Sequence, residues 1–177
     1  LRDCHVAILG LGAIGRATAE LLRAFGSRVS YWNRTPKPDA GFEYLPFDRI
    51  LSECDIVSIH LAVAPETEGI IGQRALSLMK PGSILINTAR GEIVDQEALR
   101  QAIESGRVLG AGLDTLSPEP VTADNPLVQL PPSLRERLVL SPHIGGITAG
   151  SFRRYFELIW ANVACVAAGE EPKNIVN

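Results

Sequence analysis

The sequence predicts an α/β protein built on a Rossmann-type, doubly wound parallel sheet, and three observations lead to this prediction. Apolar segments of strand length alternate with segments whose apolar residues recur at helical spacing along the whole chain. The first apolar segment, residues 5–9, runs directly into the glycine-rich sequence of residues 10–15. A helical apolar pattern follows at once, which gives the strand, glycine turn and helix of a dinucleotide-binding βαβ unit.

The glycine-rich sequence Gly10-Leu-Gly12-Ala13-Ile14-Gly15 has the spacing of a turn that binds a pyrophosphate. Gly10 permits the tight turn after the strand, and Gly12 lets the phosphates approach the backbone. Gly15 lets the helix pack closely on the strand. The free N–H groups at the positive end of that helix, those of Ala13 and Ile14, then face the phosphates. The turn therefore predicts a dinucleotide site.

The first half of the chain continues the alternation of strands and helices. Apolar residues between Ile14 and Phe25 recur at helical spacing and predict the first helix. Turn-forming residues at 33–39 and 65–67 predict loops. In order, the other elements expected here are strands at 28–32, 43–45 and 55–60 and a short helix at 47–54.

The second half alternates in the same way. The Lys-Pro-Gly sequence at 80–82 ends one expected helix, whereas Asp95 caps the next helix and Gly106 ends it. The proline-rich segment 118–132 is expected to be a long irregular connection, a kind of segment that is more often functional than idle. In order, the expected elements are a helix at 73–79, a strand at 83–87, a helix between Asp95 and Gly106, strands at 108–113 and 138–140, and a final helix at 151–168.

Apolar strands that alternate with helices imply a parallel sheet covered on both faces. The final helix is expected to bury its apolar face, either in the core or at an interdomain or intersubunit surface. That face consists of Phe152, Tyr155, Phe156, Ile159 and Val163. Ligands of such sheets bind in a crevice at the carboxyl ends of the strands. The residues that directly follow each strand are therefore candidate functional residues.

Length and composition narrow the class of protein. The 177 residues, with interspersed charges and a formal net charge of −3, fit a single domain over 1–177 and give no sign of a nucleic-acid or membrane partner. Apolar stretches have strand length, so no membrane span or signal peptide is expected. Scattered cysteines and histidines favour reduced thiols, no metal site and a cytoplasmic location. The start at Leu1, almost on the first strand, is typical of a domain excised from a longer protein.

Polar side chains follow the expected strands at the edge that carries the glycine turn. They are Arg90, Asp114, Glu119 and His143. Taken one at a time, each has an ordinary structural explanation: a surface ion pair, a turn or cap, solvation, and a backbone hydrogen bond, in that order. These explanations do not require a shared position. That shared position favours polar chemistry on a carbonyl group beside a nicotinamide.

Four segments make the chain resemble the nucleotide-binding domain of the D-isomer-specific 2-hydroxyacid dehydrogenases. They span nearly all of the chain in the family's order, at residues 10–15, 78–82 with 87–91, 110–114 through 118–120, and 141–146. The resemblance implies an NAD(P)-dependent oxidoreductase that transfers hydride between the nicotinamide and a small 2-keto or D-2-hydroxy acid. Within the family, the chain is similar to glyoxylate and hydroxypyruvate reductases.

The resemblance also implies a role for each polar residue, because Arg90, Glu119 and His143 match the family's catalytic positions. Arg90 would bind the substrate carboxylate and polarise the carbonyl. His143 would give a proton to the carbonyl oxygen, while Glu119 would orient the imidazole ring and favour its protonated form. The positions expected to contact the cofactor through this resemblance and the glycine turn are Gly10, Gly12, Ala13, Ile14, Gly15, Thr88, Ala89, Arg90, Asp114, His143, Gly145 and Gly146.

The end of the second expected strand bears on the choice of cofactor. NAD-preferring domains end this strand with Asp or Glu, whose carboxylate accepts hydrogen bonds from the ribose hydroxyls. Here Asn33 cannot repel a 2′-phosphate, and Arg34 and Thr35 add a cation and a hydroxyl. The sequence therefore favours NADP(H) over NAD(H) as the bound cofactor. The alternative is that Arg34 stacks on the adenine or points into solvent.

Three positions near the expected cofactor pocket bear on this resemblance. The family loop that commonly reads Leu-Pro-Leu-Thr-Pro is Leu-Ala-Val-Ala-Pro at 61–65, which leaves its cofactor contacts open. His60, directly before this loop, either lines the cofactor pocket or packs at the end of its strand. Thr115 replaces the valine that usually follows the family's aspartate.

The resemblance implies partners as well. A substrate-binding domain, built from residues before this region and a return segment that begins at 170–177, would complete the active site, and a homodimer is expected. The chain alone should therefore bind cofactor but turn over 2-keto acids poorly. The alternative class is a dinucleotide-sensing interaction protein, similar to corepressors that keep the same triad. A short-chain reductase and a P-loop hydrolase are poorly supported, because neither Tyr-x-x-x-Lys nor Gly-Lys-Ser/Thr occurs.

Overall fold

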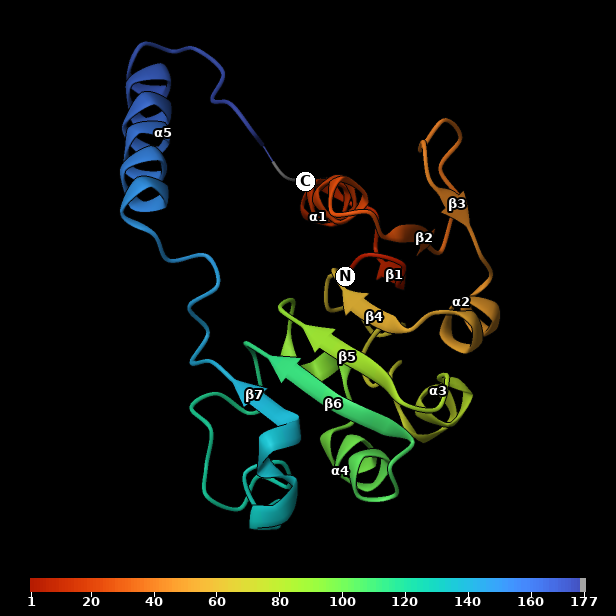
Figure 1. Ribbon diagram of the computed structural model, residues 1–177. Helices are drawn as coiled ribbons and strands as arrows, with labels where there is room; N and C mark the ends of the chain where they lie inside the picture. The colour runs from red at the N-terminus through yellow and green to blue at the C-terminus, as the bar shows by residue number, and fades with distance from the viewer. Residues whose placement is uncertain (176–177) are drawn as a thin grey trace. The chain divides into compact units, whose positions relative to one another are not determined.

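The computed structural model describes residues 1–175, which form two units, residues 1–143 and the segment from residue 144 onward. The end of the expected return segment, residues 176 and 177, lies outside the described part of the chain. The first unit contains a seven-stranded parallel sheet in the order β3-β2-β1-β4-β5-β6-β7 (Figure 1). From β1 the sheet extends through β2 to β3 on one side, and from β4 to β7 on the other side, so the strand order reverses direction between β1 and β4. The predicted doubly wound, Rossmann-type fold is therefore confirmed.

The strands and helices lie close to the positions that the sequence predicts. The strands are β1 (His5–Leu9), β2 (Arg28–Trp32), β3 (Glu43–Tyr44), β4 (Ile56–Ile59), β5 (Ser83–Asn87), β6 (Val108–Leu113) and β7 (Leu138–Leu140). The helices are α1 (Ala13–Ala24), α2 (Phe47–Glu53), α3 (Gln73–Leu78), α4 (Gln96–Glu104) and α5 (Ala149–Ala167). Two short 3-10 helices, Gly91–Ile93 and Pro132–Arg137, were not expected.

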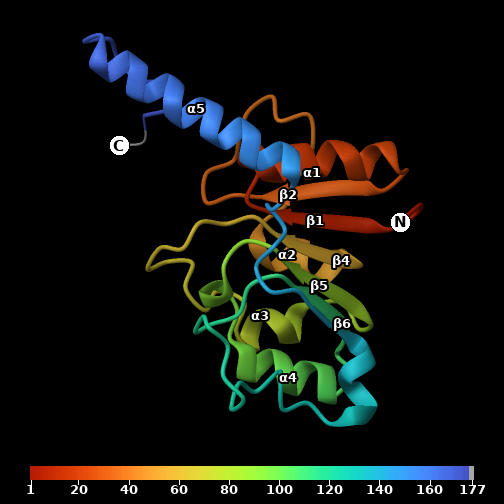
Figure 2. The same cartoon turned by 90° about the vertical axis from the view of Figure 1, so that its left-hand side faces the viewer.

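Successive side chains of the strands point into two core clusters, one on each face of the sheet. Leu9, Val57 and Leu85 belong to the larger cluster, which α2, α3 and α4 cover. Ile8 and Tyr31 belong to the smaller cluster, which α1 covers. In Figures 1 and 2, α2, α3 and α4 form a row along the sheet, whereas α1 lies beside β1 and β2.

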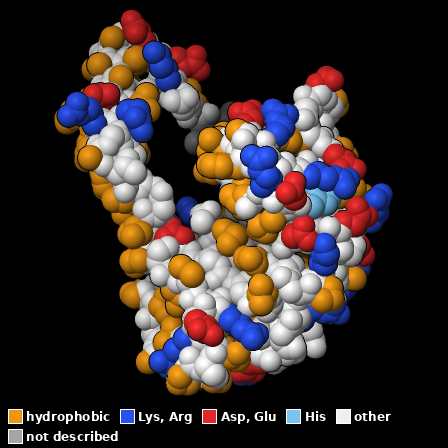
Figure 3. Space-filling model, in the orientation of Figure 1, with side chains coloured by type: hydrophobic (Ala, Val, Ile, Leu, Met, Phe, Trp, Pro, Cys, Tyr) orange, Lys and Arg blue, Asp and Glu red, His pale blue; other side chains and the backbone are white. Residues whose placement is uncertain are grey.

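Within the first unit the helices cover the two faces unequally, which differs from the expectation of a fully covered sheet. Crossovers between parallel strands are right-handed, so α2, α3 and α4, which lead toward β7, lie on one face, and α1, which leads toward β3, lies on the other. The α1 side of β5, β6 and β7 therefore carries an open groove. Leu109 and Val139 are 52% and 68% exposed there, and hydrophobic side chains reach the surface drawn in Figure 3.

The second unit contains the helix α5, which begins at a capping box formed by Thr148 and Ser151. Its apolar face is not buried within this unit, in which α5 is the only helix or strand among the described residues. The side chains expected to be buried are 37% to 63% exposed, namely Phe152, Tyr155, Phe156, Ile159 and Val163. An interdomain or intersubunit role for this face stays a prediction. Among residues 1–175, no helix has the length and apolar character needed to cross a membrane.

The cysteine side chains Cys4, Cys54 and Cys165 are free thiols. Cys54 is fully buried in the larger core cluster, and this burial raises the pKa of its thiol to about 12. A buried thiol with such a pKa is unreactive at neutral pH. Cys54 is therefore a packing residue.

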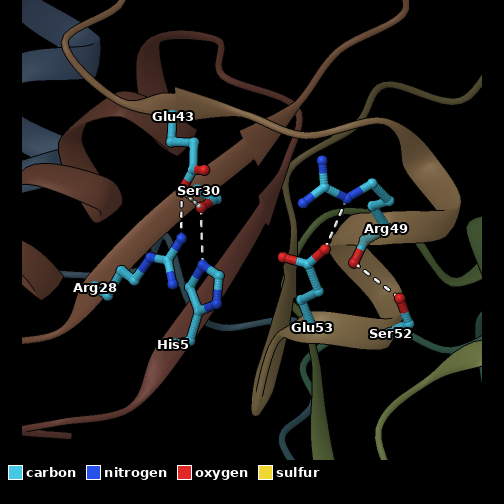
Figure 4. Close-up of polar contacts among 7 residues, drawn as sticks. All are labelled: His5, Arg28, Ser30, Glu43, Arg49, Ser52 and Glu53. Carbon is cyan, nitrogen blue, oxygen red and sulfur yellow. Dashed lines mark hydrogen bonds and ion pairs between the residues drawn. The ribbon is translucent and has the colours of Figure 1, made fainter.

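At the edge where the strands begin, a chain of polar side chains links β1, β2 and β3 (Figure 4). The Nε2 of His5 lies 2.8 Å from the Oγ of Ser30, whose hydroxyl donates to the Oε2 of Glu43 at 3.0 Å. The guanidinium of Arg28 binds the same carboxylate oxygen at 2.8 Å. Because Ser30 donates its proton to Glu43, the His5 ring is the donor toward Ser30. This network holds the two-residue strand β3 on the sheet.

Burial, together with the nearby Arg28 guanidinium, lowers the pKa of His5 from its ordinary value of 6.5. The unfolded chain therefore binds this proton more readily than the folded chain. The free energy of unfolding is expected to fall as the pH drops through 6.5 toward the folded-state pKa. Urea denaturation at about pH 7.5 and about pH 5.5 measures this loss. The His5→Gln variant keeps a donor toward Ser30 but does not titrate, so an equally large loss in that variant would contradict the prediction.

Candidate active site

The glycine turn between β1 and α1 is built by close backbone contacts. A Cβ atom on Gly15 would lie 2.1 Å from the carbonyl oxygen of Gly10, and one on Gly10 would lie 2.6 Å from the carbonyl oxygen of His60. Only glycine fits at these two positions, so α1 begins directly beside the turn. A Cβ atom on Gly12 would meet no other group within 4 Å, which leaves open space beside the backbone.

The N-terminus of α1 is open to an anion. Its N-cap Gly12 provides no capping side chain, and the first turn contains no acidic residue. The N–H groups of Ala13 and Ile14 at this end of the helix therefore have no side-chain cap. Together with the open space beside Gly12, this geometry fits a phosphate or a pyrophosphate group.

The segment after β2 folds back onto the glycine turn. The Oδ1 of Asn33 accepts a hydrogen bond of 2.7 Å from the N–H of Leu11, and the Nζ of Lys37 donates to the carbonyl oxygen of Leu11 at 2.7 Å. The hydroxyl of Tyr31 accepts from the N–H of Lys37 and donates to its carbonyl oxygen, each at 2.9 Å. These bonds fix the backbone that carries Asn33 and its neighbours beside the turn.

Two adjoining pockets run along the edge where the strands end. The first, of about 540 Å³, lies between residues 32–35 after β2 and residues 61–70 after β4. The second, of about 520 Å³, lies between Ile14, residues 60–63 and residues 88–90. Residues 61 and 62 line both pockets, so the two form one trough from the end of β2 to the end of β5.

His60 lies at the end of β4 and lines the second pocket. Its Nε2 is 2.9 Å from the Oγ of Ser58, and burial lowers the pKa of its imidazole. The packing of the ring at the end of its strand is confirmed, and a contact with the cofactor stays a prediction. The ring packs at the end of its strand, and it also borders the trough as a neutral group.

Arg90 lies in a loop after β5 that Asn87 holds in place. The side chain of Asn87 donates to the carbonyl oxygen of Arg90 at 2.8 Å and accepts from the N–H of Ala89 at 3.0 Å. The Nη1 of Arg90 donates to the carbonyl oxygen of Ala89 at 2.7 Å, and the side chain is exposed. The ion pairs found within residues 1–175 do not include Arg90. Its guanidinium therefore lies at an open edge, not in a surface ion pair.

The loop of Arg90 packs directly on the loop of Glu119. A Cβ atom on Gly91 would lie 2.2 Å from the carbonyl carbon of Leu116, so only glycine permits this contact. The N–H of Leu116 in turn lies 3.3 Å from the Oε1 of Glu119 and donates to it. Close backbone packing at Gly91 therefore joins the two loops.

His143 and Glu119 form a hydrogen-bonded pair at the same edge. The Nδ1 of His143 lies 2.8 Å from the Oε2 of Glu119, and the two side chains are 44% and 40% exposed. The hydrogen bond with His143, a second one from the N–H of Leu116 and the charge of Arg90 hold the pKa of Glu119 below its usual range. The carboxylate is therefore ionised at neutral pH.

The backbone of His143 is placed by the ends of β6 and β7. Its φ angle of 53° is left-handed, a conformation that costs a non-glycine residue about 1 kcal/mol. The N–H of His143 donates to the carbonyl oxygen of Asp114 at 2.8 Å, which helps to offset this cost. The hydroxyl of Ser141 donates to the Oδ1 of Asp114, so that this carboxylate is oriented as well.

The structure brings most of the candidate site residues to one edge of the first unit. The catalytic candidates Arg90, Glu119 and His143 lie there with Asp114, close in sequence or contact to the strand ends. The trough and the turn contain the other candidates, namely Gly10, Gly12, Ala13, Ile14, Gly15, Asn33, Arg34, Thr35, Thr88 and Ala89. Gly145 and Gly146 belong to the second unit, so their predicted contact with the cofactor stays a prediction.

Several residues of this edge were given no role from the sequence. Lys37, Ser141 and Glu66 each act through a partner that is distant along the chain, so no local pattern could reveal them. Asn87 is different, because it clamps the loop that directly follows it. An Asn at the end of a strand and before a tight loop is a signal for such a clamp.

Comparison of the sequence and the structure with known proteins tests the predicted resemblance. A family model for the D-isomer specific 2-hydroxyacid dehydrogenase, NAD binding domain, matches residues 1–145. The chain belongs to this family. The matched region contains every strand of the sheet and each of the three catalytic candidates, which lie at positions 90, 119 and 143.

Relatives of this D-2-hydroxyacid dehydrogenase domain cover it almost completely. The glyoxylate reductase of Thermococcus litoralis is 41% identical over 181 residues, covering 100% of this chain and 53% of that protein. D-lactate dehydrogenase with NAD+ from Lactobacillus jensenii has a TM-score of 0.86 and 32% identity, over 98% of this chain and 56% of that one. The acyclic imino acid reductase Bsp5 with NADPH and D-Arg has a TM-score of 0.89 and 30% identity, over 99% and 54%. The chain spans about half the length of the curated glyoxylate reductases it matches.

Thr115 offers a test of packing in this dehydrogenase domain. It is 2% exposed, and its Oγ1 has no hydrogen-bond partner among residues 1–175. Burying an unpaired hydroxyl costs about 1–3 kcal/mol, so Thr115→Val is expected to raise the free energy of unfolding by about 1 kcal/mol. Thr115→Ser keeps the hydroxyl and removes a methyl group, so it should be less stable than the parent. Chemical denaturation measures both, and a Val variant no more stable than the parent would contradict the prediction.

Proposed function

We propose that this chain is the cofactor-binding domain of an NAD(P)-dependent oxidoreductase that interconverts a small 2-keto acid and its D-2-hydroxy acid. The observation that carries the proposal is the pair of His143 and Glu119, 2.8 Å apart, on the edge that also carries the open N-terminus of α1. The family membership and the similarity to a glyoxylate reductase support it. In the proposed enzyme a substrate-binding domain completes the active site beside this one, and the whole protein forms a homodimer.

The pair supplies the proton transfer of the proposed reaction. When bound, a nicotinamide supplies the hydride that the carbonyl carbon receives. Glu119 occupies the Nδ1 of His143, which leaves Nε2 as the ring nitrogen that faces a substrate. In the direction of reduction, the imidazolium holds at Nε2 the proton that the carbonyl oxygen receives. In the reverse direction, the neutral ring accepts that proton from the hydroxyl group.

Arg90 binds the carboxylate of the substrate in this proposal. Its Nη1 donates to the carbonyl oxygen of Ala89, which orients the planar guanidinium. The remaining N–H donors match a carboxylate in a bidentate arrangement. The nearby carboxylate of Glu119 repels the substrate carboxylate, and the positive charge of Arg90 offsets this repulsion.

The glycine turn and the trough hold the cofactor in this proposal. The open N-terminus of α1 suits the pyrophosphate, and the second pocket, which reaches the end of β5, suits the nicotinamide half. The residues assigned to the cofactor are Gly10, Gly12, Ala13, Ile14, Gly15, Thr88, Ala89, Arg90, Asp114, His143, Gly145 and Gly146, with Asn33, Arg34 and Thr35 at the adenosine end.

The proposed cofactor is NADP(H) in preference to NAD(H). The N–H of Leu11 occupies the Oδ1 of Asn33, so the NH₂ group is the part of that side chain left to meet the ribose. A donor suits the oxygens of a 2′-phosphate, whereas the carboxylate of an NAD-type site would repel them. Arg34 adds a guanidinium to the same pocket. Lys37 adds an ammonium group beside the carbonyl of Leu11.

Parallel calorimetric titrations of this chain with NADPH and NADH test the cofactor assignment. NADPH is expected to bind about tenfold more tightly, as one charge-assisted hydrogen bond would provide. Arg34→Ala should weaken NADPH binding about tenfold and NADH binding less than about twofold. The control is Arg74→Ala, which removes a guanidinium paired with Asp48 outside both pockets. Equal losses for both cofactors in Arg34→Ala would sink the assignment.

Steady-state reduction of glyoxylate and hydroxypyruvate tests the catalytic assignment. The present chain alone is expected to turn over either acid poorly, so robust turnover by it would argue against the proposed second domain. In the chain joined to a substrate-binding domain, His143→Gln should lower kcat by about 10²- to 10⁴-fold. Glu119→Gln should lower kcat less, because the ring of His143 keeps a polar partner at Nδ1 but loses the carboxylate that orients it. Unchanged kcat in His143→Gln would remove the proposed proton donor.

A further inference from the structure

We propose that Glu66 is a specificity-determining residue of the cofactor site. Its carboxylate shares the first pocket with Arg34 and lowers the affinity for a cofactor that carries a 2′-phosphate. The inference rests on the proposed preference for NADP(H), to which it adds a group that opposes the preference. The ratio of the affinities for NADP(H) and NAD(H) then depends on both the guanidinium of Arg34 and the carboxylate of Glu66.

Glu66 and Arg34 come from the loops after β4 and β2 and line the same pocket. The Oε2 of Glu66 lies 3.9 Å from the Nη1 of Arg34, and the side chains are 65% and 82% exposed. An ion pair as open to water as this one contributes little to stability. Either group can therefore exchange its partner for a ligand at little cost to the fold.

The backbone that carries Glu66 is a well-fixed turn. The hydroxyl of Thr67 accepts a hydrogen bond from the N–H of Ala64 at 2.8 Å and donates to the carbonyl oxygen of Ala62 at 2.7 Å. Further along, the N–H of Gly69 donates to the carbonyl oxygen of Glu92 at 2.8 Å. The carboxylate can rotate about its own side chain, but its backbone stays beside the pocket.

A 2′-phosphate brings a second anion into this pocket, with a charge between about −1.5 and −2 near neutral pH. Glu66 opposes it in two ways, because it repels the phosphate directly and competes with it for the guanidinium of Arg34. At about 4 Å in water, the interaction of two unit charges corresponds to roughly a fivefold change in affinity. NAD(H) carries a neutral hydroxyl at this position, so neither effect applies to it.

Calorimetric titration of Glu66→Gln with NADPH and NADH tests this inference. Glutamine keeps the size and polarity of the side chain and removes the charge. The Kd for NADPH is expected to fall about threefold to tenfold, and the Kd for NADH to change less than about twofold. The gain for NADPH should shrink as NaCl is added, because salt screens exposed charges.

The matched control is Glu68→Gln, which removes a carboxylate from the same turn but outside the lining of the pocket. It should leave both Kd values within about twofold of the parent. A gain for NADPH in Glu66→Gln that is no larger than in Glu68→Gln overturns the inference.

Arg34→Ala separates the failure of this inference from the failure of the proposed cofactor preference. If Arg34→Ala selectively weakens NADPH binding while Glu66→Gln leaves the Kd for NADPH unchanged, the preference for NADP(H) stands and the proposed role of Glu66 is overturned. If Arg34→Ala weakens both cofactors equally, the preference and the inference are overturned together.

Discussion

Backbone hydrogen bonds between neighbouring parallel strands align the strand ends from which the candidate functional residues follow. At four strand ends, the first residue beyond a strand donates its N–H to the last residue of the strand beside it. At 2.7–3.0 Å, these bonds run from Gly10 to Trp32, from His60 to Leu9, from Asp114 to Asn87 and from Ser141 to Leu113. Because all strands run in one direction, these residues meet at a single edge. The side chains of the site extend from positions that the sheet has already aligned.

The two edges of the sheet differ in how their polar groups are satisfied. Where the strands begin, His5 and Ser30 are buried and bind one another and a carboxylate within the protein. Where the strands end, Arg90 and His143 are exposed or half-exposed, and part of their hydrogen-bonding capacity faces solvent. The first edge thus stabilises the fold, and the second keeps charged groups in positions from which they can meet a ligand.

The fold could be predicted from the sequence because its signals are local. The spacing of apolar residues marks each strand and helix, and the turn at residues 10–15 is a contiguous motif. The rest depends on contacts between distant segments. The amide of Asn33 is recognised as a donor only once Leu11 is known to occupy its oxygen, and Glu66 meets Arg34 only in the folded chain. The exposure of α5 likewise depends on which elements are present to cover it.

Gly91 lets the loop of Arg90 rest directly on the backbone at Leu116, one turn away from Glu119 and its partner His143. The backbone beside Arg90 is thus fixed against the loop that carries Glu119, whose carboxylate binds the imidazole of His143. In a 2-keto acid, the carboxylate and the carbonyl oxygen sit on adjacent carbon atoms. Under the proposed roles, this domain recognises only the carboxylate and the adjacent carbonyl group of the substrate. The rest of the substrate, whatever its length, would then be recognised outside this domain.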